Sequence, residues 1–355
     1  MFRALLSDDT PRSRWLALLL IVILVGLAVA PFAFPGAKSL NVAARICVFI
    51  VLAASFDLLL GYTGIVSFAH TMFFGIGAYG VAIGCTQYDG SWAGIGLGVL
   101  GALALSAVLS LVIGLFSLRV RAIFFSMITL AVAFSFQTFA SQMSEWTGGD
   151  DGLNFSVPDV LSPGFQLFDA QIFGVSITGR LLTYYLVFFC ALLMFLKMLR
   201  IVNSPFGRVL QAIRENMFRA EAIGYNTVVY RTVANVFAAL FATLAGALMA
   251  LWQHNTGPET SLSFEIMVDI LLIVVIGGMG TLYGAICGAA IFILAQSYLE
   301  DLMAHAADAA QGVPLLAALF SPDRWLLWLG VLFILSVYFL PTGIVGKLRS
   351  RASKN

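Results

Sequence analysis

The residues of this sequence that could do chemistry are the few ionisable side chains that interrupt long apolar runs. Asp57, His70 and Asp269 lie within such runs, and Glu265 lies near the end of one. Because a charge inside a membrane is costly, such a residue either lines a polar pathway or satisfies backbone groups at an interrupted helix. Both interpretations stay open for the two aspartates, whereas the structural one is favoured for His70.

The other reactive side chains do not form the pattern of a catalytic or metal site. The chain has three His and four Cys residues, and no CxxC or Cys/His pair has the spacing of a metal site. Residues 75–80 match G-x-G-x-x-G, but no strand precedes them, so close helix packing accounts for these glycines better than a dinucleotide. We therefore expect a chain without enzymatic activity, bound metal or cofactor.

The composition is that of a membrane protein. Only 10% of the 355 residues are charged, against about 25% in a typical soluble domain. Runs such as "WLALLLIVILVGLAVAPFAF" are long enough to cross a bilayer core about 30 Å thick, and they lack the alternation of barrel strands. We predict an all-α polytopic membrane protein with one transmembrane domain over 1–355 and about ten transmembrane helices. The predicted spans are 14–34, 41–60, 65–84, 92–117, 122–142, 181–199, 229–251, 265–279, 281–300 and 324–342.

The positions of Lys and Arg set the predicted orientation, because cytoplasmic loops are enriched in both. Basic residues gather before the first span, after the fourth, after the sixth and in the tail, so both termini are predicted to be cytoplasmic. The net charge of +1 gives no reason to expect a nucleic-acid partner. The loop over 143–180 is predicted to be extracytoplasmic. This loop contains a glycine-rich turn whose acidic residues either fix the turn or meet a basic surface of a partner. This turn comprises Thr147, Gly148, Gly149, Asp150, Asp151 and Gly152.

Two predicted spans are interrupted by glycines. One covers 61–80 and the other 269–288, and as the third and eighth spans they would run in opposite directions. Broken helices at corresponding places in two halves are typical of an inverted repeat around a central translocation pathway. The pathway candidates are Asp57, Gly61, Tyr62, Gly64, His70, Glu265, Asp269, Gly277, Gly278 and Gly280.

The segment over 203–224 predicts a short amphipathic helix on the cytoplasmic side. Ser204 and Pro205 are typical of a helix start, and a glycine marks the stop. One face is apolar, whereas the opposite face carries both signs of charge. Acidic side chains such as Glu215 are unfavourable against anionic lipid, so the mixed charge favours a protein partner over the membrane surface.

Several stretches together carry a family resemblance over nearly the whole chain. They are "SPFGRVLQAIRENMFRAEAIGYN", "LLLGYTGIVSFAHTMFFGIGAYG", "TGGDDGL", "VVIGGMGTLYGAICGA" and "FLPTGIVG". In these stretches the sequence resembles the permeases of branched-chain amino acid ABC transporters, and specifically the LivM-type inner-membrane subunit. The first stretch is similar to the family's cytoplasmic coupling segment, although Arg219 stands where the family has a small residue.

The resemblance implies a subunit of an ATP-driven importer of branched-chain or related hydrophobic amino acids in the bacterial inner membrane. Its partners would be a second homologous permease, two cytoplasmic ATP-binding subunits, a periplasmic substrate-binding protein and the surrounding lipid. The 203–224 helix would dock on an ATP-binding subunit. The coupling residues that the resemblance implies are Ser204, Phe206, Gly207, Arg208, Ala212, Ile213, Arg214, Glu215, Asn216, Ala220, Glu221 and Gly224.

Two alternatives remain open at this stage. Relatives with nearly the same motifs serve urea, amides or aromatic acids, so the substrate class has a second possibility. A stand-alone ion-coupled secondary transporter would explain the broken helices and the intramembrane aspartates. It would not explain the mixed-charge helix over 203–224.

Overall fold

The structure is a computed structural model that describes residues 13–34, 36–117, 122–172, 175–309, 321 and 324–352. Helices dominate this part of the chain, and within it nine are long and apolar enough to cross a membrane. They are α2 (Arg14–Ala33), α3 (Ala37–Thr63), α5 (Trp92–Ser117), α6 (Ala122–Gln142), α8 (Gly179–Val202), α11 (Thr227–Gln253), α12 (Pro258–Ser261) continued by α13 (Phe264–Gly277), α14 (Leu282–Ala309), and α16 (Trp325–Phe339) continued by α17 (Gly343–Ala352). The predicted all-α polytopic class is confirmed.

The predicted third span, 65–84, begins later than expected and is not among those nine helices. Its helix, α4 (His70–Gln87), has 18 residues and starts only after a non-helical stretch at 64–69. It packs mainly against α11 and α5, and most of its side chains are buried. Because protein surrounds it, this short helix does not have to match the thickness of the hydrocarbon by itself.

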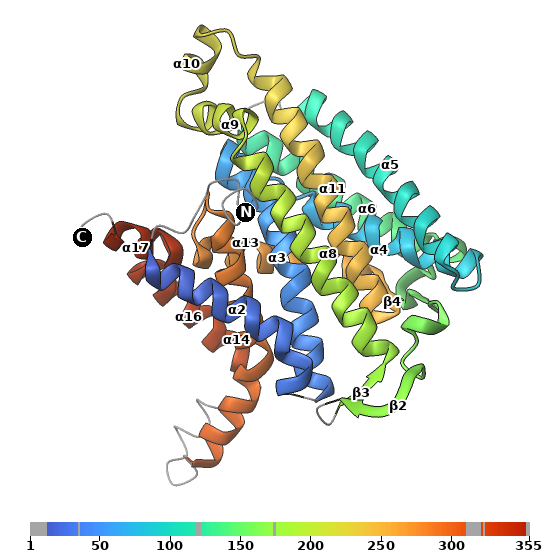
Figure 1. Cartoon of the computed structure of the whole chain (residues 1–355). Helices are drawn as coiled ribbons and strands as arrows, with labels where there is room; N and C mark the ends of the chain where they lie inside the picture. The colour runs from blue at the N-terminus through green and yellow to red at the C-terminus, as the bar shows by residue number, and fades with distance from the viewer. Residues whose placement is uncertain are drawn as a thin grey trace.

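Two long helices, α3 and α11, form the centre of the bundle and run in opposite directions (Figure 1). Each has 27 residues, and within the apolar 18-residue stretch of each helix 94% of the residues of α3 and 72% of those of α11 are buried. The indole N–H of Trp252, at the end of α11, donates to Asn41 Oδ1, near the start of α3, at 3.0 Å. By contrast, only 17% of the residues in the apolar 18-residue stretches of α2, α5 and α6 are buried, so these outer helices expose apolar side chains to lipid.

The chain repeats one order of elements with the direction reversed. In each half a long central helix (α3 or α11) is followed by a connecting segment, a shorter helix (α4 or α13) and a helix that folds back on it (α5 or α14). In the second half the connecting segment contains β4 and α12. The fold-back contact is made by glycines in both halves, Gly84 with Gly94 and Gly277 with Gly284. The third and eighth predicted spans therefore correspond, but their glycine breaks do not: one precedes α4 and the other follows α13.

The two ends of the bundle differ in structure (Figure 1). One end carries the short helices α9 (Pro205–Glu215) and α10 (Met217–Ala222), and we refer to it as the α9 end. The other end, the β end, carries two small antiparallel pairings, β1 (Leu153–Asn154) with β4 (Asn255–Thr256) and β2 (Gln166–Ile172) with β3 (Val175–Thr178). The predicted loop over 143–180 forms most of the β end, and its residues 173–174 lie outside the described residues.

The glycine-rich turn in that loop is a tight turn. α7 (Ser144–Thr147) ends at Gly148, and Gly148, Gly149 and Gly152 all have positive φ angles, of 76°, 65° and 71°. The Thr147 hydroxyl donates to the Met143 carbonyl at 2.7 Å, which closes the preceding helical turn. Asp150 and its neighbour Asp151 are exposed. The interpretation of these residues as a turn is sufficient to account for the glycines.

Close backbone contact fixes α4 on α11. A methyl group at Gly77 would collide with the backbone carbonyl of Thr243, and one at Gly246 would collide with that of Phe74. The two glycines thus face the opposite helix reciprocally, which lets the two helix axes approach as small residues allow in membrane proteins.

We expect Gly77→Ala to destabilise the protein by about 1–3 kcal/mol, because a backbone carbonyl cannot move aside as a side chain can. The melting temperature of the detergent-purified chain measures this effect. Gly101→Ala on α5 is the matched control, since nothing lies within 4 Å of the position of its added methyl group. Equal melting temperatures for the two variants would contradict the close-contact interpretation.

Candidate functional site

The first helix break is a non-helical stretch between α3 and α4 at the α9 end. α3 stops at Gly64, which has a φ of 73°, a conformation that favours glycine. The backbone groups freed by the break are satisfied from α6: Ser126 Oγ donates to the Val66 carbonyl at 2.9 Å, and Phe68 N–H donates to Thr129 Oγ1 at 3.1 Å. Such side-chain partners are what permits irregular backbone at membrane depth.

The second break separates α13 from α14 at the same end. Gly278 and Gly280 have φ angles of 117° and 79°, so the turn needs glycine at both positions. Thr281 Oγ1 donates to the Gly278 carbonyl at 2.7 Å and closes the turn. Gly343, the first residue of α17, packs directly on Gly278, so the stretch "FLPTGIVG" supports this break from outside.

The two breaks touch each other. Asp57 Oδ1, on the last part of α3, accepts a hydrogen bond from the backbone N–H of Gly280 at 2.8 Å. Gly61 lies one turn later, where an added methyl group would meet both the Asp57 carboxylate and the Gly280 backbone. Glycine at this position therefore allows the end of α3 and the turn between α13 and α14 to make direct contact.

A cation from outside the bundle completes this junction. Arg214, near the end of α9, donates from Nη1 to the backbone carbonyl of Gly61. A methyl group added to Gly280 would lie 2.8 Å from the same nitrogen, so the guanidinium also borders the second break. We call the set of Asp57, Gly61, Arg214 and Gly280 the break junction.

The segment over 203–224 differs from the single predicted helix. It forms α9 and α10, separated by Asn216, whose backbone is extended with φ of −157° and ψ of 99°. Asn216 Oδ1 accepts from the N–H of Arg219 at 2.9 Å, so Asn216 caps the second helix. Ser204 holds the first cap position, but its hydroxyl donates backwards to the Ile201 carbonyl at 2.6 Å rather than accepting from α9.

Most apolar residues of α9 hold it onto the bundle. Leu210 and Ile213 are buried, and Gly207 packs against the backbone of Val202. Phe206 stacks on Tyr230 of α11, with ring centroids 5.7 Å apart. These residues therefore position α9 within the chain and are not free to contact a partner.

The free surface of the segment lies on and after α10. Phe218 is 82% exposed and Ile223 is 67% exposed, although both are large and apolar. The sequence pattern did not single out either residue, because an apolar side chain in an amphipathic helix is expected to face inward. Glu221, on α10, accepts a hydrogen bond at Oε1 from Thr227 Oγ1 at 2.6 Å, which connects α10 to the start of α11. Arg208 and Glu215 are exposed on α9.

The other predicted pathway residues lie apart from the break junction or have structural partners. His70 Nε2 lies 2.9 Å from Ser55 Oγ, and its ring meets Phe56 edge-on at 5.4 Å, in a fully packed environment. Tyr62 is also buried. Asp269 belongs to the part of α13 nearer the β end, where it accepts from Gln296 at 3.4 Å, and Glu265 is exposed one turn before it.

An apolar cavity of about 630 Å³ lies between α4, α5 and α6. Its walls include Leu105, Phe136 and Phe139, and among its few polar groups is the Gln87 side chain. Within the described residues, no group of three or more His, Cys, Asp or Glu side chains could hold a metal ion.

Residues 39–337 match the family model described as the branched-chain amino acid transport system / permease component. The chain belongs to this family. It is 26% identical, over 85% of its length and 74% of the relative's, to the high-affinity branched-chain amino acid transport system permease protein LivM of Salmonella typhimurium. It is 27% identical to the probable LivM permease of Methanocaldococcus jannaschii, over 71% of this chain and 69% of that protein. The LivH permease of Salmonella typhimurium is 24% identical over 84% of this chain and 91% of its own length. No solved structure matches the chain.

We expect Asp57→Asn to lower the transport rate about fivefold while leaving the fold intact. The amide oxygen still accepts from the Gly280 N–H, but this hydrogen bond loses the charge of the carboxylate, and hydrogen bonds to a charged group are stronger than neutral ones by roughly 1 kcal/mol. Uptake of a branched-chain amino acid by cells with the full transport system measures the effect, and Asp89→Asn, at an exposed position between α4 and α5, is the control. A wild-type rate in Asp57→Asn would leave Asp57 with the structural role alone.

Proposed function

We propose that this chain is a permease subunit of an ATP-driven importer that moves branched-chain or related hydrophobic amino acids across the bacterial inner membrane. Membership of the permease family and the printed functions of the LivM and LivH relatives support the class of protein and the substrate. The chain would pair with a second homologous permease, two ATP-binding subunits and a periplasmic substrate-binding protein.

The observation that carries this proposal is the contact of Arg214 with both helix breaks. α9 is fixed to the bundle by its buried face, so a force applied to it reaches the Gly61 carbonyl and the Gly280 turn through one guanidinium. ATP-binding subunits that move α9 would therefore directly displace the ends of α3 and α13. In this mechanism the coupling is a displacement of packed helices about short breaks, as in other alternating-access transporters.

The exposed apolar side chains of Phe218 and Ile223 support a protein partner at the α9 end. Large exposed apolar groups on a short polar helix are typical of docking sites, and a groove on an ATP-binding subunit would bury them. A transporter that works alone would have no use for this surface. The urea and amide alternatives concern only the substrate and use the same coupling surface.

The charge distribution supports a cytoplasmic α9 end. Arg200, Arg208 and Arg219 lie at this end, together with the basic helix α17. The β end carries acidic residues such as Asp150 and Asp159. By the positive-inside rule the α9 end then faces the cytoplasm and the 143–180 loop faces the periplasm. The two chain termini, also predicted to be cytoplasmic, lie outside the described residues.

We expect Arg214→Ala to reduce the number of amino acids imported per ATP hydrolysed at least about tenfold, because it removes a charged donor to the Gly61 carbonyl. Assembly with the ATP-binding subunits and ATP hydrolysis should persist. Proteoliposomes containing the purified complex allow both rates to be measured together. Arg200→Ala, which removes an exposed arginine at the same end of the bundle, should keep the wild-type ratio; an unchanged ratio in Arg214→Ala would refute the coupling role.

We expect Phe218→Asp to prevent the ATP-binding subunits from co-purifying with this chain, because it places a charge in the apolar contact. The chain itself should remain folded, since this side chain is 82% exposed. Phe34→Asp is the matched control: Phe34 is 66% exposed but lies at the β end. Equal recovery of the subunits with both variants would exclude α10 as the docking element.

A further inference from the structure

A polar seam crosses the bundle where α3, α13 and α14 meet, in the half nearer the β end. Arg45 Nη2, on α3, donates to Gln296 Oε1, on α14, at 3.0 Å. Gln296 Nε2 in turn donates to Asp269 Oδ2, on α13, at 3.4 Å. All three residues are half-buried, and all three belong to helices long and apolar enough to cross a membrane.

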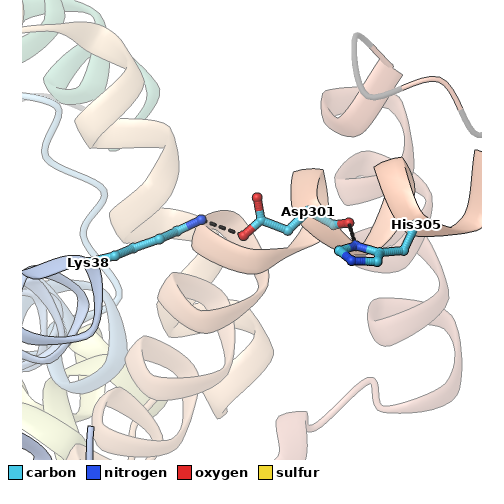
Figure 2. A network of polar contacts seen from close by, with 3 residues as sticks. All are labelled: Lys38, Asp301 and His305. Carbon is cyan, nitrogen blue, oxygen red and sulfur yellow. Dashed lines mark hydrogen bonds and ion pairs between the residues drawn. The ribbon is translucent and has the colours of Figure 1, made fainter. Parts of the chain in front are cut away.

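An ion pair marks the outer end of this seam (Figure 2). Lys38 Nζ lies 2.5 Å from Asp301 Oδ2, and the two side chains are 56% and 54% exposed. His305 Nδ1 lies 2.7 Å from the backbone carbonyl of Asp301, which ties the next turn of α14 to the same place. Lys38 precedes Arg45 by two helical turns on α3, so the seam leads from this exposed pair into the apolar part of the bundle.

The inner part of the seam is not arranged as a structural ion pair. Arg45 and Asp269 carry opposite charges, yet the neutral carboxamide of Gln296 separates them. A direct Arg–carboxylate pair makes two parallel hydrogen bonds and would join α3 to α13 more strongly. Half-exposed charges in apolar helices are costly against lipid, so they indicate a surface that faces a polar pathway.

The Gln296 carboxamide presents polar groups in the same order as the backbone of an α-amino acid. It turns an oxygen to the Arg45 cation and an N–H group to the Asp269 carboxylate, with a single carbon between them. An α-amino acid presents the same order of atoms, a carboxylate oxygen and an ammonium nitrogen with two carbons between them, and carries full charges in place of partial ones. Full charges make the stronger hydrogen bonds to both partners.

We propose that Arg45 and Asp269 bind the backbone of the transported α-amino acid, Arg45 holding its carboxylate and Asp269 its ammonium, in the place that the Gln296 carboxamide fills. This inference rests on the proposed import of amino acids and adds the site that recognises them within this chain. Its chemistry selects the zwitterion and leaves the side chain of the amino acid unspecified.

The competing explanation is a structural clamp between three helices. The effect of removing Gln296 distinguishes a clamp from a binding site. In a clamp, Gln296 is the central member, so its removal weakens the seam as much as removal of either charge. In a binding site, Gln296 competes with the ligand, so Gln296→Ala retains or strengthens binding.

The test uses the assembled transporter in nanodiscs, without the substrate-binding protein, and measures equilibrium binding of radiolabelled leucine. We expect Arg45→Gln and Asp269→Asn to raise the Kd for leucine at least about tenfold, since a hydrogen bond to a charged group contributes roughly 1.5–3 kcal/mol. Gln296→Ala should bind leucine as tightly as the wild type or more tightly. Lys38→Ala, at the exposed outer pair, is the control and should keep the wild-type Kd. The melting temperature of each variant shows whether it is folded.

Competition with leucine derivatives assigns each charge to its partner. Leucinamide lacks the carboxylate, so it should compete equally well in wild type and Arg45→Gln. N-acetylleucine lacks the ammonium, so it should compete equally well in wild type and Asp269→Asn.

The outcomes separate this inference from the proposed function. If the complete transporter with its binding protein imports no leucine, the proposed function falls and the site falls with it. If it imports leucine but shows no saturable binding, or if Arg45→Gln and Asp269→Asn bind as the wild type does, only the site is overturned. A rise in Kd for Gln296→Ala equal to that of the charge variants would assign the seam to a structural clamp.

Discussion

The contact between Asp57 and the backbone N–H of Gly280 is the interaction on which the α9 end of the bundle depends. It joins the end of α3 to the turn between α13 and α14, two places more than two hundred residues apart in sequence. The contact exists only because Gly61 has no side chain and because Gly278 and Gly280 adopt positive φ angles. A carboxylate that accepts from a turn N–H also offsets the cost of burying its charge. Arg214 can therefore approach both breaks at a single point.

The breaks are stable in an apolar environment because side chains satisfy some of their backbone groups. Ser126 and Thr129 of α6 make hydrogen bonds to the first break, and the Thr281 hydroxyl donates to the Gly278 carbonyl within the second. Each of these partners is a side chain, so the breaks can change shape without losing every hydrogen bond. The long helices around them cannot, since each carries an uninterrupted ladder of backbone bonds.

The sequence was sufficient for the fold class and for the presence of a break within 61–80 and within 269–288, because runs of apolar residues and glycines act locally. It did not place the start of α4, which lies at His70 and not at residue 65. It was not sufficient for the division of the 203–224 segment at Asn216. The apolar spacing continues across that residue from Ile213 to Met217 and Ala220, so periodicity alone predicts one helix. The partners of Asp57 and Asp269 were equally hidden, because Gly280 and Gln296 reach them only through tertiary packing.

Two helices connect the polar seam to the break junction, which gives the proposed mechanism a physical path. α3 carries Arg45 in the seam and Asp57 in the junction, about 18 Å apart at 1.5 Å of rise per residue. α13 carries Asp269 in the seam and ends at the turn that contains Gly280. A relative shift of the two helix ends at the junction therefore changes the separation of Arg45 and Asp269 as well. Because an α-amino acid has a fixed distance between its charged groups, such a shift would alter its affinity for the seam, which is the differential affinity that coupling between two sites requires.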